Sequence, residues 1–200
     1  MKIAIVGAGN AGCITALHYY KYLSKQTDLG FEITIYHSPN EHPIERVGQG
    51  TTLDPTKLIF TTLGINWFNN PIGATVKGGI LYEGWGKKKD KHFHQFAPTR
   101  VAMHFVPQKL SKEVLESGYF NVIEKTITDP EEEIDADVIF DCRGRHNRDK
   151  NNYDTIINPL NSVLLCNKKG KDPDLIYTRT VATPNGWTFV IPNVDSVSYG

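Results

Sequence analysis

The 200-residue sequence predicts an α/β fold, with a parallel β-sheet and added β-strands. Residues 2–6 form a short apolar run bounded by glycine, which is typical of a buried strand. Residues 9–25 follow with the apolar stripe of an amphipathic helix, and residues 32–36 are β-branched and strand-like. Strand, helix and strand together span about 38 residues, the usual size of a βαβ unit, and such units build parallel sheets.

Two more helices and several strands are predicted downstream of this unit. Asp54 and Pro55 suit the N-cap and the first position of a helix that Gly64 ends. A short helix over 107–117 ends at Gly118. Further strands are expected at 75–85, 91–96, 134–141, 162–166 and 186–191. Because the sequence ends in a strand-like run, 197–200, we expect these residues to be one domain that is truncated and continues beyond Gly200.

Composition excludes several classes of partner. Lys plus Arg and Asp plus Glu both number 22, and zero net charge argues against nucleic acid or an anionic membrane as the main partner. No apolar stretch approaches the ~18 residues of a membrane span. Three cysteines without metal or redox spacing fit a reducing cytoplasm. His92 and His94 share a strand face but have no evident third ligand, so no metal site is expected.

A glycine motif, Gly7-Ala8-Gly9-Asn10-Ala11-Gly12, joins the first strand to the first helix. Gly7 permits a tight turn, Gly9 lets the backbone approach a pyrophosphate, and Gly12 lets the helix pack on the sheet. Asn10 and Ala11 then contribute to a helix N-terminus that can bind the anion. The motif predicts a Rossmann-like dinucleotide-binding fold, but alone it does not choose between FAD and NAD.

The end of the second strand lacks the acidic residue that commonly binds a ribose hydroxyl. The chain has Tyr36-His37-Ser38 there, and no arginine that would bind a 2′-phosphate. His37 or Ser38 could bind the ribose, Glu41 could fold back to it, or no side chain contacts it.

Two further segments are candidate ligand contacts. Gly48, Gln49, Gly50 and Thr51 form a glycine-bracketed loop directly before a helix, where bare backbone can lie against a planar ligand. An ordinary loop is the alternative. Lys77 precedes two glycines within an apolar strand, and such glycines often mark the close approach of a ligand. Its side chain either points into a site or extends to water.

Taken together, these segments resemble the flavin-dependent halogenases of the tryptophan halogenase family over the whole chain. The matching segments are GAGNAG, RVGQGTTLDP, ATVKGGILYEGW, IDADVIFDCRG and LIYTRTVATPNGWTFVIP. GWTFVIP is the most specific, because it resembles the family's GWxWxIP motif, which ordinary flavin hydroxylases lack. Four residues depart from the family pattern: Gln49 replaces Glu, Arg143 a small hydroxyl residue, His37 the ribose carboxylate, and Phe189 the second tryptophan.

The resemblance implies a Rossmann-like FAD-binding fold of the glutathione-reductase or flavin-monooxygenase type. It also implies FAD, used as FADH2 from a separate flavin reductase, together with O2 and a halide ion. The hypohalous acid formed would reach an electron-rich, indole- or phenol-like substrate, with Lys77 as the catalytic residue. Trp187, Phe189, Ile191 and Pro192 would lie along the route between flavin and substrate.

Two other functions remain open. A flavin-dependent aromatic hydroxylase shares the glycine motif, although GWTFVIP and the Lys77-Gly78-Gly79 strand speak against it. The second is a non-catalytic FAD-binding module. A homo-oligomer is compatible with either.

Overall fold

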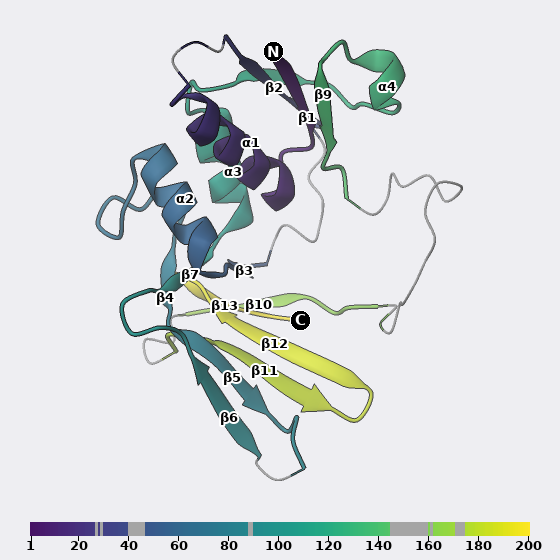
Figure 1. Cartoon of the computed structure of the whole chain (residues 1–200). Coiled ribbons are helices and arrows are strands. Elements are labelled where there is room, and N and C mark those ends of the chain that lie inside the picture. The colour runs from purple at the N-terminus through teal and green to yellow at the C-terminus, as the bar shows by residue number, and fades with distance from the viewer. Residues whose placement is uncertain are drawn as a thin grey trace.

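The computed structural model describes residues 1–26, 28, 30–39, 47–87, 90–144, 160, 162–170 and 175–200. Its elements form three sheets and four helices within these residues. Figure 1 shows a four-stranded sheet with its helices at the top, a six-stranded sheet at the bottom and a three-stranded sheet between them. In the described residues no helix is long and apolar enough to cross a membrane.

The four-stranded sheet is entirely parallel and confirms the predicted α/β fold. Its strands, in spatial order, are β8 (Asn121–Glu124), β2 (Glu32–His37), β1 (Lys2–Val6) and β9 (Val138–Asp141). Strand β1 is buried from its second residue onward. Ile3 and Ile5 face the helical core, while Ala4 and Val6 pack with Ile127 on the other side. Cover on both faces is what a continuous apolar strand requires.

Three helices lie on one side of this sheet: α1 (Asn10–Leu23), α2 (Leu53–Leu63) and α3 (Pro107–Leu115). Helix α1 packs directly on β1 and β2, and α2 and α3 pack against α1, as Figure 1 shows. The short α4 (Pro130–Glu133) lies beside β9. Gly64, with φ of +66°, is the C-cap of α2 and ends this helix as predicted. The predicted end of the second helix is wrong: α3 ends at Leu115 with Glu116 as its C-cap, and Gly118, with φ of +74°, lies in the turn beyond it.

The predicted start of α2 is wrong by two residues. Thr52, with φ −87° and ψ −174°, is its N-cap. Asp54 lies instead in the first turn, where its carboxylate pairs with Arg100 and a negative charge is favourable.

The six-stranded sheet is antiparallel except for one pair. Its order is β10 (Cys166–Lys169), β13 (Ser196–Tyr199), β12 (Gly186–Pro192), β11 (Thr178–Thr183), β5 (Gly79–Glu83) and β6 (Lys91–Gln95). Strands β11 and β5 are parallel, with Thr178 beside Ile80. The three-stranded sheet joins β3 (Gln49–Gly50), β7 (Ala102–Phe105) and β4 (Thr75–Lys77).

The single strand predicted over 75–85 is in fact two strands of different sheets. Gly78 interrupts it: its N–H donates to the Ile176 carbonyl at 2.8 Å, and its carbonyl accepts from the Phe96 N–H at 2.9 Å. Gly79 then allows β6 to approach, because a Cβ there would lie 2.4 Å from the His94 carbonyl oxygen. The two glycines therefore turn the chain from one sheet into the next.

Two other strand predictions have wrong boundaries. The strand expected over 134–141 begins at Val138, because Ile134 packs into a small side cluster and the Asp137 carboxylate accepts from the Lys2 N–H at 2.7 Å. The strand expected over 162–166 is β10, which begins at Cys166, where pairing with Tyr199 starts.

A buried polar chain joins the middle sheet to the six-stranded sheet. Thr75 Oγ1 of β4 donates to the Pro192 carbonyl of β12 at 2.9 Å and lies 3.4 Å from His104 Nδ1 of β7. His104 Nε2 lies 2.9 Å from Thr178 Oγ1 of β11. His104 is fully buried, and burial together with the nearby charge of Lys77 lowers its pKa to about 3.

This low pKa predicts a loss of stability in mild acid. Below the unfolded-state value of about 6.5 the unfolded chain binds a proton that folded His104 refuses down to about pH 3. Stability is therefore full above pH 6.5 and falls by up to about 1.4 kcal/mol per pH unit below it. Urea unfolding from pH 7 to 4.5 should show His104→Gln losing this dependence. A constant difference between variant and wild type would contradict the prediction.

Candidate active site

The predicted dinucleotide turn has the geometry that the glycine motif implies. Gly7 follows β1 with φ of +111°, and a Cβ there would lie 2.6 Å from the Cys142 carbonyl oxygen. A Cβ on Gly12 would lie 1.8 Å from the Gly7 carbonyl oxygen. Both positions therefore exclude side chains, which lets α1 begin close against the ends of β1 and β9.

The N-terminus of α1 can receive an anionic ligand. Gly9 is its N-cap, no side chain caps the helix, and its first turn holds no acidic residue. The first N–H groups of a helix have no acceptor within the helix. Asn10 Oδ1 is also buried without a hydrogen-bond partner. Gly9, Asn10 and Ala11 thus place unused donors and one unused acceptor where a dinucleotide would lie, so the residues present fit FAD.

At the end of β2, polar groups of His37 and Ser38 are already hydrogen-bonded to neighbouring residues. The His37 carbonyl accepts from the Lys125 N–H at 2.9 Å, and Ser38 Oγ lies 3.1 Å from Thr126 Oγ1. Both residues remain candidates for a ribose contact. Glu41 lies outside the described residues.

The glycine loop after residue 46 is fixed to the six-stranded sheet by a buried amide and hydroxyl network. The Gly48 N–H donates to Ser198 Oγ at 2.9 Å, which also accepts from Asn193 Nδ2 at 2.8 Å and donates to Asn167 Oδ1. A Cβ on Gly48 would lie 1.9 Å from Asn193 Oδ1. The loop therefore needs glycine here to reach the sheet.

Lys77 is the last residue of β4, and its side chain points into the protein rather than to water. It is 7% exposed, and its Nζ donates to the Thr51 carbonyl at 3.0 Å. The same Nζ lies 5.6 Å from the centre of the Phe96 ring, within the range of a cation–π contact. Burial lowers the pKa of Lys77 below its ordinary value, so the neutral amine is more accessible than in an exposed lysine.

A cavity of about 310 Å³ brings the separate sequence predictions together. Its lining combines the glycine loop, the lysine and the GWTFVIP strand: Gly48, Gln49, Gly50, Lys77, Thr178, Trp187, Phe189 and Ile191. All but Thr178 were predicted from the sequence. Thr51 and Pro192 lie just outside, where Thr51 binds Lys77 and Pro192 binds Thr75 through their carbonyls. The turn at Gly7 to Gly12 does not line this cavity.

Sequence analysis missed Thr178 and His104. Thr178 begins β11 and reaches the cavity only because β11 pairs with β5. His104 lies within the apolar run Ala102–Phe105, which reads as a simple buried strand. The one available signal was a histidine in the middle of that run.

Arg143, a departure from the family pattern, is engaged away from the cavity. Its guanidinium binds both oxygens of Asp141 at 2.9 and 2.7 Å, and its Nη1 donates to the carbonyls of Ile127 and Thr128. This contact raises the pKa of Arg143 and lowers that of Asp141. Arg143 therefore fixes the chain after β9. Cys142 packs against the core, and burial raises the pKa of its thiol, so it behaves as a filler.

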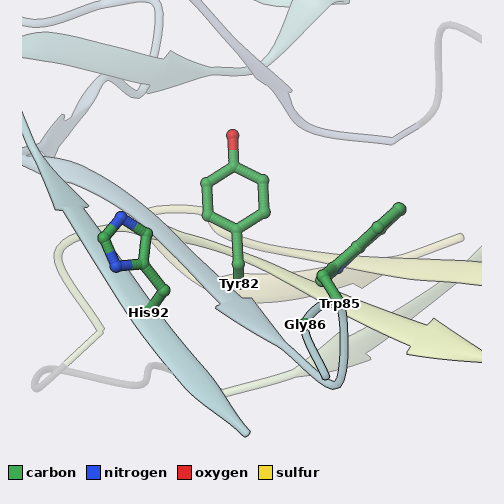
Figure 2. Close-up of a pocket in the computed structure, with 4 residues that line it drawn as sticks. All are labelled: Tyr82, Trp85, Gly86 and His92. Carbon is green, nitrogen blue, oxygen red and sulfur yellow. The ribbon is translucent and has the colours of Figure 1, made fainter. Parts of the chain in front are cut away.

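A second hollow, of about 330 Å³, is aromatic and lined by Tyr82, Trp85, Gly86 and His92. Figure 2 shows the Tyr82 ring between those of His92 and Trp85. The Trp85 ring lies 6.3 Å from that of Trp187, so aromatic contacts link this hollow to the Lys77 cavity. His92 and His94 are exposed, and the described residues contain no cluster suited to a metal ion.

Solved structures share this architecture. A tryptophan 6-halogenase from Streptomyces toxytricini matches 99% of the chain with a TM-score of 0.70 and 18% identity. A tryptophan halogenase from Shewanella frigidimarina NCIMB 400 matches 100% with a TM-score of 0.69 and 16% identity. A flavin-dependent halogenase from Brevundimonas sp. BAL3 matches 99% with a TM-score of 0.66 and 17% identity. At such identities the likeness shows the fold, and this chain covers 55% of each of those chains.

Sequence comparison carries the family assignment. No curated protein sequence matches the chain. The sequence profile described as tryptophan halogenase matches residues 2–113, more than half of the 200. This chain therefore belongs to the tryptophan halogenase family.

Proposed function

We propose that this chain carries the FAD-binding part and the catalytic lysine of a flavin-dependent halogenase. The enzyme would use FADH2, O2 and a halide to halogenate an electron-rich aromatic ring of the indole or phenol type. One observation carries the proposal: a buried lysine, Lys77, shares a cavity with the glycine loop at Gly48 and the family strand at Trp187.

Residues at the start of α1 would hold the cofactor. The N–H groups of Gly9, Asn10 and Ala11 would face the pyrophosphate, and a hydroxyl group of the cofactor would donate to Asn10 Oδ1, which lacks a partner. The glycine loop at 48–50 would lie against the flavin ring system, with Thr51 carrying the loop into α2. His37 is our candidate for the ribose. When bound, reduced FAD supplies two electrons, which with two from the halide reduce O2 to water and hypohalous acid.

Lys77 would act on the hypohalous acid. As an ammonium it would donate a hydrogen bond to the acid and polarise its O–X bond. As a neutral amine, which burial favours, it would form a haloamine and release water. In either case the ring takes the halogen and loses a proton, and the oxygen leaves as water. The low exposure of Lys77 excludes water and strengthens such a hydrogen bond.

The strand Gly186–Pro192 would separate the flavin from the substrate. Trp187, Phe189 and Ile191 line the cavity beside Lys77, and Pro192 fixes the end of the strand through Thr75. Large side chains there would keep the aromatic substrate away from the flavin. This favours halogenation over the hydroxylase alternative, in which the ring must reach the flavin directly.

Other components follow from the chemistry. A separate flavin reductase would supply FADH2. None of the three cysteines, Cys13, Cys142 and Cys166, forms a disulfide, which would suit a reducing cytoplasm.

Gly9→Val tests cofactor binding. Two added methyl groups at the helix N-terminus would occupy the place of the pyrophosphate, so we expect FAD affinity to fall below detection in calorimetry. The unfolding temperature, measured alongside, should change little because Gly9 precedes the helix. Tight NADH binding without FAD binding in the wild type would contradict the assignment of the cofactor.

Lys77→Ala tests the chemical step. We expect halogenated product, measured by mass spectrometry on the whole protein, to fall roughly 10²-fold or more. Flavin reoxidation, followed by absorbance, should continue. Lys77→Arg should fail as well, since a guanidinium is larger and forms no haloamine. Product retained by Lys77→Ala would refute the mechanism, and a hydroxylated product in wild type would favour the hydroxylase.

Trp187→Ala tests the separating strand. The side chain is 43% exposed at the cavity wall, so its removal should not unfold the sheet. We expect less halogenated product per flavin oxidised and no hydroxylation. Phe189→Leu provides a milder control. Unchanged product yield in Trp187→Ala would exclude this role.

A further inference from the structure

Thr178 is a cavity residue whose hydroxyl proton has a direction set by the buried chain behind it. Its Oγ1 faces His104 Nε2 at 2.9 Å, yet the residue also lines the cavity that contains Lys77. The Gly78 N–H donates to the Ile176 carbonyl, which holds the start of β11 beside the lysine. The Thr178 hydroxyl has one proton, so it can offer the cavity either that proton or only its lone pairs.

The hydrogen bond between Thr75 and Pro192, at the other end of this series of polar contacts, determines whether Thr178 donates or accepts. The Pro192 carbonyl can only accept, so Thr75 must use its single hydroxyl proton for the 2.9 Å contact. Thr75 Oγ1 then acts as acceptor for His104 Nδ1, 3.4 Å away. A neutral imidazole carries one N–H, so Nε2 is left as an acceptor. Thr178 must therefore donate its proton to His104 and keep its lone pairs for the cavity.

Lys77 complements this arrangement. One Nζ hydrogen binds the Thr51 carbonyl, and the remaining Nζ hydrogens are available to a guest. The cavity thus presents donors from Lys77 and a fixed acceptor from Thr178. A guest that matches both must accept one hydrogen bond and donate another. A halide ion only accepts, and would meet the lone pairs of Thr178 unfavourably.

We propose that Thr178 binds the O–H of the hypohalous acid while Lys77 binds its oxygen, and that His104 positions Thr178 for this. The pair selects the hydroxylic oxidant over the halide from which it forms. The inference rests on the proposed halogenase function and names which species the Lys77 cavity retains. His104 acts through Thr178 and touches no reactant.

Retention of the oxidant is tested by comparing Thr178→Val with Thr178→Ser in the whole protein. Val keeps the shape and removes the acceptor, so product per flavin oxidised should fall roughly fivefold, the effect of one hydrogen bond. The lost oxidant should appear in solution, trapped by added methionine as its sulfoxide. Thr178→Ser should retain wild-type coupling. Equal coupling in Val and wild type, with unfolding temperatures matched, would overturn the proposal.

The direction of the hydroxyl is tested without any halogenation. Side-chain ¹⁵N chemical shifts, with His104 assigned by its loss in His104→Gln, should report the Nδ1–H tautomer from pH 5 to 8. An Nε2–H tautomer would make Thr178 a donor and overturn the proposal. If wild type makes no halogenated product, the proposed function fails, while the Nδ1–H result would still support an acceptor at Thr178.

Discussion

The interruption of the strand at Gly78, between β4 and β5, is the constraint on which the site depends. Residues 75–85 are predicted as one strand from their side-chain pattern, but the Gly78 N–H and carbonyl bind Ile176 and Phe96 instead of continuing one ladder. Lys77 is thereby the last residue of the middle sheet, and Gly79 is the first of the six-stranded sheet. A side chain at such a junction is enclosed by two sheets, which explains how a lysine between apolar neighbours becomes buried.

Burial of Lys77 then constrains the electrostatics around it. In the part of the chain that the structure describes, its contacts are the Thr51 carbonyl and the Phe96 ring, and no carboxylate pairs with it. Loss of hydration without a counter-charge disfavours the ammonium. His104 stays neutral chiefly because its own burial disfavours the imidazolium, and a positive charge on Lys77 adds repulsion. With one proton on the neutral imidazole, the Thr75–Pro192 hydrogen bond determines the His104 tautomer. The tautomer in turn determines the direction of the hydrogen bond between His104 and Thr178.

The sequence could predict those features that local residue types determine. Glycines at 7, 9 and 12 identify the dinucleotide turn because their role depends on neighbours in the chain, and the end of α2 follows from Gly64. Features that depend on pairing between distant segments were not predictable. The Gly78 switch requires β6 and residue 176, and Thr178 enters the cavity only through the parallel pairing of β11 with β5. The sequence identified seven of the eight cavity residues, but it could not show that they share one cavity.

The departures from the family pattern acquire a physical meaning when they are placed in the structure. The charge of Arg143 is neutralised by Asp141. Its hydrogen bond to the Ile127 carbonyl holds the chain after β9 in place, away from the cavity. Gln49 and Phe189 instead line the cavity with Lys77. A glutamate at position 49 would bring a negative charge to this cavity and favour the ammonium form of Lys77. The amide of Gln49 brings none, so nothing there offsets the effect of burial on the lysine. Phe189 lacks an indole N–H and adds no donor, whereas the Gln49 amide can both donate and accept without carrying a charge. Lys77 is thus the ionisable residue in the cavity lining, and burial rather than a counter-charge determines its protonation.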